Sequence, residues 1–240
     1  MIDFERRVAA LAQFRVLDPS RPTLDPEDDR HLRAVLRARA GEEVVVSDGR
    51  GRWRLCVVTP DGVDPVTDVR VDPDLVPSAL YLAPLKGDRT EWALVKAVEL
   101  GVTDVTPLLT ARAAVRWRAE ARTRVLARWR RLASEAAGQC RRTHDLVIHE
   151  PVGVMEVPAE VAVADVGGSS DWRGVRAVAI GPEGGWAHDE WLPARRRVSL
   201  GPLVLRGETA AVAAATLLGA LGSTWGWRAG HSGIDNDEWR

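Results

Sequence analysis

The sequence predicts an α/β protein in which a small β-rich unit precedes a larger domain of alternating strands and helices. From residue 79 to residue 221, apolar strand-like runs alternate with helix-like segments. That alternation is typical of a mostly parallel sheet covered on both faces. Ahead of it, two β-branched runs within residues 44–58 flank an Asp48-Gly49 turn, which is a strong hairpin signal.

The N-terminal unit is predicted over residues 1–73. In residues 28–37 the apolar side chains Leu32, Val35 and Leu36 have helical spacing, and acids at the start suit the helix dipole. The stretch Asp72-Pro-Asp-Leu-Val-Pro77 carries two prolines and predicts a linker. The sequence therefore divides into an N-terminal domain and a second domain over residues 77–222.

The second domain is predicted to contain five strands and four helices. We expect the strands at 79–85, 105–109, 160–166, 176–180 and 198–200, and the helices at 89–100, 116–138, 189–196 and 208–221. The tail, residues 223–240, is rich in glycine and acids, and we expect it to be poorly ordered.

Composition limits the class of protein. A chain of 240 residues with 28% charged and 45% hydrophobic residues is typical of a globular protein. No apolar run has the length of a membrane span, and charges at positions 3, 5, 6 and 7 interrupt any signal-peptide core. We therefore expect a cytoplasmic protein without a membrane partner. Cys56 and Cys140 lack metal-type spacing, so we expect reduced thiols and no metal.

The charge is balanced overall but not locally. The net charge is −1, yet ten arginines and only two acids lie between Arg112 and Arg142. Such a cluster gives a balanced protein a phosphate-binding face, although a solvated helix surface would have the same composition.

Two glycine-rich turns are the main functional signal. Ile180-Gly-Pro-Glu-Gly-Gly-Trp186 follows one predicted strand, and Leu200-Gly-Pro-Leu-Val-Leu-Arg-Gly-Glu-Thr-Ala210 follows the next. Glycine lets the backbone approach a ligand closely and adopt positive φ. Either turn alone is ordinary, but the pair predicts one ligand held by main-chain groups.

Together with three further motifs, these turns resemble the RsmE family of 16S ribosomal RNA uridine N3-methyltransferases. The others are Lys86-Gly-Asp-Arg-Thr-Glu-Trp92, Lys96-Ala-Val-Glu-Leu-Gly-Val102 and Glu135-Ala-Ala-Gly-Gln-Cys-Arg-Arg142. Arg30-His-Leu-Arg-Ala-Val-Leu-Arg37 and Asp48-Gly-Arg-Gly51 fit the family's RNA-binding domain. The resemblance covers roughly residues 12–220. The chain departs from the family's usual pattern at several positions, including Gly207, where threonine or serine is more common.

The resemblance implies a PUA-like β-barrel followed by a SPOUT methyltransferase domain with a C-terminal trefoil knot. It implies the cofactor S-adenosyl-L-methionine, bound in the knot loops, and a homodimer. The implied substrate is one uridine of 16S rRNA in the small ribosomal subunit. Two alternatives stay open: another knotted RNA methyltransferase, acting on a ribose 2′-oxygen or another base, and a non-catalytic RNA-binding protein of ribosome assembly.

Site residues follow from the motifs. For cofactor binding we predict Ile180, Gly181, Pro182, Glu183, Gly184, Gly185, Leu200, Gly201, Leu203, Leu205, Arg206, Thr209 and Ala210. Arg206 is the predicted catalytic cation, because an arginine is always charged and stabilises the uridine anion that methylation requires. Glu208 is the second catalytic candidate, as orienter of Arg206 or proton acceptor; its alternative is capping of the last helix.

For RNA binding we predict six arginines: Arg33, Arg37, Arg112, Arg116, Arg141 and Arg142. Arginine matches phosphate with two parallel hydrogen bonds and stacks on exposed bases. The alternative for Arg141 and Arg142 is a solvated helix end. Lys86, Arg89 and Glu99 are assigned to a polar network that supports the fold.

Overall fold

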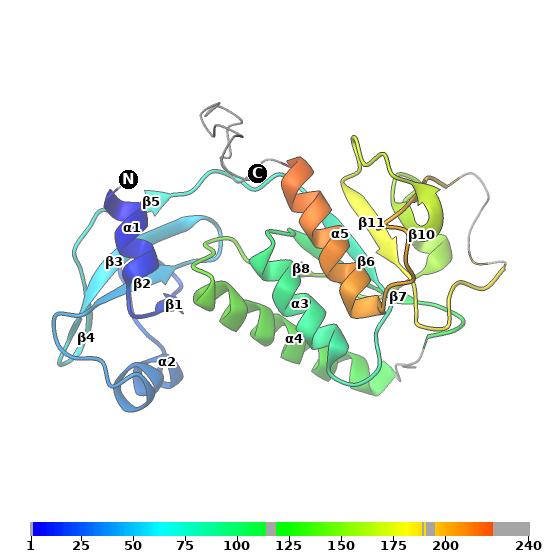
Figure 1. Ribbon diagram of the computed structural model, residues 1–240. Helices are drawn as coiled ribbons and strands as arrows, with labels where there is room; N and C mark the ends of the chain where they lie inside the picture. The colour runs from blue at the N-terminus through cyan, green and yellow to red at the C-terminus, as the bar shows by residue number, and fades with distance from the viewer. Residues whose placement is uncertain (1, 114–118, 189, 191–194, 223–240) are drawn as a thin grey trace, which may run out of the picture.

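A computed structural model of the chain describes residues 2–113, 119–188, 190 and 195–222 (Figure 1). Three sequence predictions lie outside these residues: the RNA-binding role of Arg116, most of the helix at 189–196, and the tail from residue 223. Figure 1 shows a small N-terminal sheet at one end of the molecule and a larger sheet, flanked by long helices, at the other.

The N-terminal domain is built on five strands. They are β1 (Gln13–Arg15), β2 (Glu43–Ser47), β3 (Arg52–Thr59), β4 (Gly62–Pro65) and β5 (Arg70–Val71). The order is β1-β2-β3-β4, with β5 also on β3, and β2 and β3 form the predicted antiparallel hairpin. The helices are α1 (Ile2–Ala9), α2 (Pro26–Arg30) and the π-helix η1 (His31–Val35).

Alternation along these strands gives the small sheet two apolar faces. Val44 and Val46 of β2 pack in a cluster with Leu32 of η1. Val45 points to the other face, where it packs in a cluster with Ala10 and Leu55. Since successive side chains of a strand point to opposite faces, this short hairpin is buried on both sides.

The second domain has a parallel sheet. Its strands are β6 (Ala79–Leu82), β7 (Asp104–Leu109), β8 (Val147–Ile148), β9 (Val152–Gly153), β10 (Ala162–Ser169), β11 (Ala177–Ile180) and β12 (Arg197–Val198). The order is β12-β10-β11-β6-β7-β8, with β9 also on β7, and these neighbouring strands are parallel to one another. The remaining helices are α3 (Arg89–Glu99), α4 (Ala119–Gln139), the 3-10 helix η2 (Val154–Glu156) and α5 (Gly207–Gly222).

The sheet is covered on both faces, as predicted, but among the described residues the long helices all contribute to the cluster on one face. Leu80 and Ile180 belong to one large cluster to which α3, α4 and α5 all contribute buried side chains. The opposite face carries the smaller Ala83 and Ala179, which pack with Val161 and other residues that follow β9. Figure 1 shows α3 and α5 running in front of the sheet. The small alanine side chains suit a face that is covered by a loop and η2.

The two domains meet through backbone hydrogen bonds. The Gly51 N–H donates to the Thr143 carbonyl (3.1 Å), and the Asp145 N–H donates to the Gly49 carbonyl (2.9 Å). Gly49 has φ +74°, and a Cβ there would lie 2.3 Å from an Asp145 carboxylate oxygen. The Asp48-Gly49 turn therefore has a second role beyond closing the hairpin, because it docks on the segment that follows α4.

Asp72 of the linker is the polar centre of this junction. Its carboxylate accepts hydrogen bonds from Arg7 Nη1 (2.6 Å), Trp53 Nε1 (2.8 Å) and Thr143 Oγ1 (2.7 Å). Burial raises the pKa of this carboxyl, but the three donors outweigh burial and leave the pKa below its ordinary value. Ionised Asp72 therefore stabilises the fold above its unfolded-state pKa, and this contribution is lost as pH falls through the folded-state pKa.

We expect Asp72→Ala to lower the free energy of unfolding by about 2 kcal/mol, because three donors lose a charged acceptor. Urea unfolding followed by tryptophan fluorescence measures the change. Asp74→Ala is the control, since the Asp74 side chain is fully exposed. Equal unfolding midpoints for the two variants would contradict the role given to Asp72.

Candidate active site

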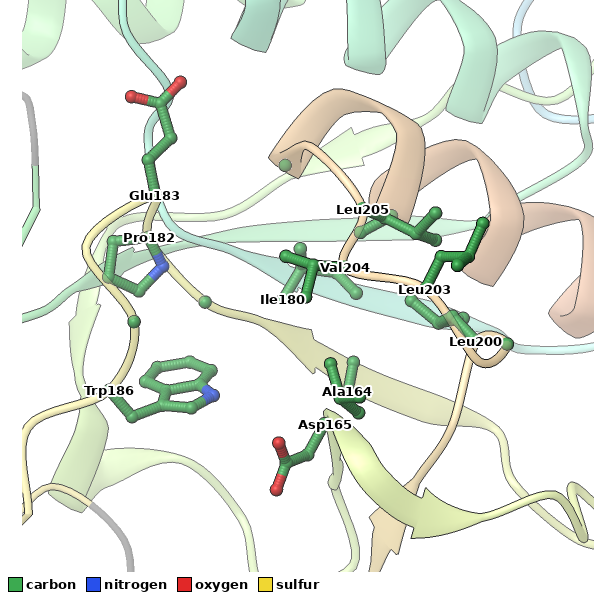
Figure 2. Close-up of a pocket in the computed structure, with 16 residues that line it drawn as sticks. Ala164, Asp165, Ile180, Pro182, Glu183, Trp186, Leu200, Leu203, Val204 and Leu205 are labelled. Carbon is green, nitrogen blue, oxygen red and sulfur yellow. The ribbon is translucent and has the colours of Figure 1, made fainter.

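A cavity of about 240 Å³ opens where parallel strands end next to the start of α5 (Figure 2). Ligands in open α/β sheets bind outside the carboxyl ends of the strands, which is where this cavity lies. The lining residues come from the middle of β10, the end of β11 and the turn after it, the loop after β12, and the first turns of α5: Ala164, Asp165, Val166, Ile180, Gly181, Pro182, Glu183, Gly185, Trp186, Leu200, Gly201, Leu203, Val204, Leu205, Gly207 and Ala210.

The first wall is the turn after β11. The Gly185 N–H donates to the Pro182 carbonyl (2.9 Å), and Gly185 has φ +69°. A Cβ at Gly181 would lie 2.7 Å from the Trp186 ring, so the absence of a side chain there lets the indole lie against the turn. A Cβ at Gly184 would instead meet Arg112 at 3.3 Å. This turn therefore presents backbone and one indole to the cavity.

The second wall is the loop after β12. The Ser199 hydroxyl accepts from the Gly201 N–H (3.2 Å) and donates to the Gly201 carbonyl (3.0 Å), and Gly201 has φ +132°. Leu203 is 71% exposed and Val204 86% exposed, although both are apolar. Figure 2 shows Leu200, Leu203, Val204 and Leu205 gathered opposite the β11 turn. The cavity thus combines backbone polar groups with apolar walls, as small-molecule sites do.

Ten of the predicted cofactor-binding residues line this cavity, and three do not. Those that do are Ile180, Gly181, Pro182, Glu183, Gly185, Leu200, Gly201, Leu203, Leu205 and Ala210. Gly184 packs on Arg112, while Arg206 and Thr209 have exposed side chains beside the lining residues. The prediction from two turns therefore located the cavity, although not every residue of the motifs faces it.

Sequence reasoning missed the contribution of β10 to the cavity. Ala164, Asp165 and Val166 of β10 line the cavity because β10 lies between β11 and β12. Figure 2 shows the Asp165 carboxylate on the same side of the cavity as Trp186. Asp165 also forms an ion pair with Arg197 of β12. An acid at the end of an apolar strand was the available signal, but the strand order that brings it to the site is not local information.

Glu183 and Glu208 share a cation that the sequence did not link to the site. The Glu183 side chain points away from the cavity in Figure 2 and forms a hydrogen-bonded ion pair with Arg89. Glu208 Oε2 lies 3.9 Å from Arg89 Nη1 and is buried without a hydrogen-bond partner. Both acids therefore lie next to Arg89, the first residue of α3, and not in an ion pair with Arg206.

The predicted RNA-binding arginines lie in several places. Arg33 donates to Asp29 and to the Thr59 carbonyl. Arg37 is exposed, with φ +52°. Arg112 Nη1 donates to the Gly184 carbonyl at 3.4 Å, which puts one exposed arginine beside the first cavity wall. Among the members of this set that the structure describes, Arg112 is the one that lies close to the site.

Arg141 and Arg142 lie at the domain junction. Arg141 Nη2 donates to the Ala10 carbonyl (2.6 Å), and Arg142 Nη1 donates to the Val98 carbonyl (2.9 Å). Burial lowers the pKa of both guanidinium groups. Arg141 therefore joins the end of α4 to the N-terminal domain, and Arg142 joins the segment after α4 to α3, two structural roles that the sequence pattern did not indicate.

Comparisons with known proteins agree with the architecture. A family model described as an RNA methyltransferase domain matches residues 73–219, and one described as an RNA methyltransferase PUA domain matches residues 24–63. The chain belongs to this family of RNA methyltransferases. The "Ribosomal RNA small subunit methyltransferase E" of Mycobacterium tuberculosis is 31% identical over 230 residues, covering 84% of this chain and 87% of the relative. The protein of the same name from Synechocystis is 29% identical over 226 residues.

Solved structures of relatives have the same fold as this RNA methyltransferase. A ribosomal RNA small subunit methyltransferase E from Neisseria gonorrhoeae, bound to S-adenosyl methionine, has a TM-score of 0.74 at 26% identity and covers 88% of this chain and 97% of that one. A Legionella pneumophila chain with the bound cofactor SAM also has a TM-score of 0.74, at 28% identity, and covers 87% and 96%. The SPOUT-type α/β fold and the PUA-like N-terminal domain expected from the sequence are confirmed.

None of the described helices combines the length and the apolar character that a membrane crossing requires. No three histidine, cysteine or acidic side chains among the described residues lie close enough together to hold a metal ion.

Proposed function

We propose that this RNA methyltransferase transfers the methyl group of S-adenosylmethionine to N3 of one uridine in 16S rRNA of the small ribosomal subunit. The observation that carries the proposal is the cavity between two backbone turns at the ends of parallel strands. Relatives named for small-subunit rRNA methylation, and solved relatives that hold the cofactor, support it. Because ribosomal RNA is the substrate, we also infer a cytoplasmic location.

The residues of the cavity fit S-adenosylmethionine. An adenine edge can approach the main chain closely at Gly185 and Gly201, because a Cβ at either position would meet nothing within 4 Å. Leu200, Leu203 and Leu205 supply apolar walls for the ring. The bound cofactor would supply an electrophilic methyl group on a positively charged sulfur. The role of the protein is to orient that group and to exclude water from it.

Methylation at N3 requires loss of the N3 proton, which leaves an anion shared between O2 and O4. Arg206 is the proposed stabiliser, since its exposed side chain stands between two residues that line the cavity, Leu205 and Gly207. A fixed cation aimed at developing charge is among the largest contributions to catalysis. Glu208 is the proposed proton acceptor, since its Oε2 has no hydrogen-bond donor. Arg112, beside the first wall, is the proposed phosphate contact nearest the target.

Asp165 is expected to favour the charged form of the cofactor. Its carboxylate lines the cavity, and a negative group there stabilises a sulfonium more than a neutral thioether. We expect Asp165→Asn to weaken S-adenosylmethionine binding about fivefold and S-adenosylhomocysteine binding less, as measured by calorimetry. Asp171→Asn, which alters a surface pair with Arg173, is the control. Equal weakening of both ligands would contradict an electrostatic role.

We propose that the enzyme is a homodimer. Leu203 and Val204 expose apolar surface next to the cavity, and Val166 is 53% exposed on the adjoining strand end. A second copy that covers this surface would exclude water from the apolar side chains and from the cavity next to them. Sedimentation tests the proposal: we expect a dimer that Val204→Glu converts to monomer. A monomeric wild-type protein at micromolar concentration would contradict it.

A trefoil knot remains a proposal as well. Its support is the double pairing of β10 with β12, in which both Ala164 and Ser169 lie opposite Val198. Residues 165–168 therefore form an irregular segment of β10 beside Val198, at the place where the resemblance expects the knot.

The decisive experiment maps the methylated nucleoside. Small subunits lacking the modification are incubated with the enzyme and labelled S-adenosylmethionine, and the rRNA is digested to nucleosides. We expect label in 3-methyluridine. Label in a 2′-O-methyl nucleoside would identify another class of RNA methyltransferase, and absence of both transfer and cofactor binding would favour a non-catalytic assembly protein.

A further inference from the structure

Arg89 links the two segments that wall the cavity. It is the first residue of α3, and its side chain forms an ion pair with Glu183 of the β11 turn. The same Nη1 atom lies 3.9 Å from Glu208 Oε2 at the start of α5. A single guanidinium therefore lies between a carboxylate from the first wall and a carboxylate from the helix that completes the second wall.

Charge and burial distinguish this arrangement from an isolated surface ion pair. The exposed fractions of the side chains are 39% for Arg89, 30% for Glu183 and only 17% for Glu208. Two carboxylates share one cation, and Glu208 Oε2 is buried with no hydrogen-bond donor. Without Arg89, the two acids would lose the cation that lies between them, and the repulsion between like charges would separate the segments.

Packing beneath the guanidinium holds the same segments. Leu85, four residues before Arg89, is buried, and its N–H donates to Thr90 Oγ1 at 2.7 Å. A Cβ at Gly207 would lie 2.4 Å from Leu85 Cδ2, so the start of α5 approaches Leu85 as closely as a glycine allows. The turn into α3 is therefore a fixed support, and Arg89 projects from it toward both acids.

We propose that Arg89 is a positioning residue for the cofactor cavity, which keeps the Glu183 turn and the start of α5 at their working separation. Arg89 does not line the cavity, so it acts on the ligand through the backbone of the two walls. The identity of the ligand rests on the proposed function, whereas the link between the two walls does not.

A matched ion pair on the same helix provides the control. Glu91 of α3 pairs with Arg128 of α4 at 2.7 Å, and the Arg128 side chain is 65% exposed. Neither residue contacts a wall of the cavity. Exposed pairs of this kind contribute little to stability. Arg128→Gln therefore removes one arginine and one ion pair without disturbing the link between the walls.

The experiment measures affinity for S-adenosylmethionine and S-adenosylhomocysteine by calorimetry in Arg89→Gln, Glu183→Gln, the double variant and Arg128→Gln. We expect Arg89→Gln to weaken both ligands about tenfold and equally, because a displaced wall affects the parts the two ligands share. Arg89→Lys should recover part of the loss, and the double variant should lose less than the sum of the single variants. Arg128→Gln should stay within about twofold of wild type.

A second measurement needs no ligand. Hydrogen exchange of the unliganded protein should be faster at residues 181–186 and 207–210 in Arg89→Gln, and unchanged there in Arg128→Gln. Unchanged exchange together with unchanged affinity would overturn the proposal, as would weakening of S-adenosylmethionine alone, which would indicate direct electrostatics. A wild-type protein that binds neither ligand would overturn the proposed function, and the exchange data would still decide the role of Arg89.

Discussion

Replacing Arg206 with alanine is expected to slow methyl transfer by about a hundredfold or more while cofactor affinity stays within about twofold. The chain places Arg206 between two lining residues, Leu205 and Gly207, yet its own side chain is exposed and does not line the cavity. The guanidinium is therefore available to the incoming base and does not form part of the lining of the cofactor cavity. Loss of a cation that acts in the transition state lowers the rate constant without a matching change in donor binding.

Single-turnover methylation of small subunits measures the rate constant, and calorimetry measures the affinity for S-adenosylmethionine. Arg176→Ala is the control for loss of charge. Arg176 is exposed and precedes β11, at the end of that strand opposite the cavity. We expect Arg206→Lys to recover only part of the rate, because an ammonium lacks the planar fork of a guanidinium. Loss of cofactor affinity to the same degree as loss of rate would assign Arg206 to the donor site instead.

The cavity could be predicted from the sequence because its walls are local features. A strand end, a glycine at positive φ and an apolar neighbour all lie within a few residues of one another, as Gly185 and Gly201 show. Asp165 could not be predicted in the same way. It reaches the cavity only because β10 lies between β11 and β12, and that order comes from long-range packing.

The arginine cluster shows a second limit of sequence reasoning. Arg112 and Arg142 have the same charge and belong to the same arginine-rich stretch of the sequence. In the structure, Arg112 is exposed beside the β11 turn, whereas Arg142 donates to the carbonyls of Val98 and His144. Guanidinium groups bind carbonyl oxygens and phosphate oxygens through the same donors. Composition therefore predicted a cationic segment but not which of its members serve the domain junction.

The uneven cover of the parallel sheet was present in the sequence as a difference in side-chain size. On β11 the helix-covered face has Val178 and Ile180, and the other face has alanines at 177 and 179. Large side chains fill the space beneath helices, while small ones let a loop approach the sheet closely. Alternation of strands and helices predicts the layers, and the size of alternate side chains indicates how each face is covered.

Gly168→Ala is expected to destabilise the domain by about 3 kcal/mol and to lower the melting temperature by about 6–12 °C. A Cβ at Gly168 would lie 2.4 Å from the Val198 carbonyl carbon and 2.7 Å from the Val198 N and O atoms. All three are backbone atoms of β12, so no side-chain rotation relieves the contact. Relief requires β12 to move away from β10, and this shift carries Leu200 and Gly201 out of the second cavity wall.

The neighbouring Gly167 provides a matched control for this prediction. A Cβ at Gly167 would meet nothing within 4 Å, so Gly167→Ala adds the same methyl group to the same strand without a clash. We expect Gly167→Ala to melt within about 2 °C of wild type and to keep its cofactor affinity. Gly168→Ala should instead have both a lower melting temperature and a weaker cofactor affinity. Calorimetry of melting and of S-adenosylmethionine binding measures the two quantities. If the two alanine variants melted together, β10 would not lie against the backbone of β12, and the second wall of the cavity would lack its support.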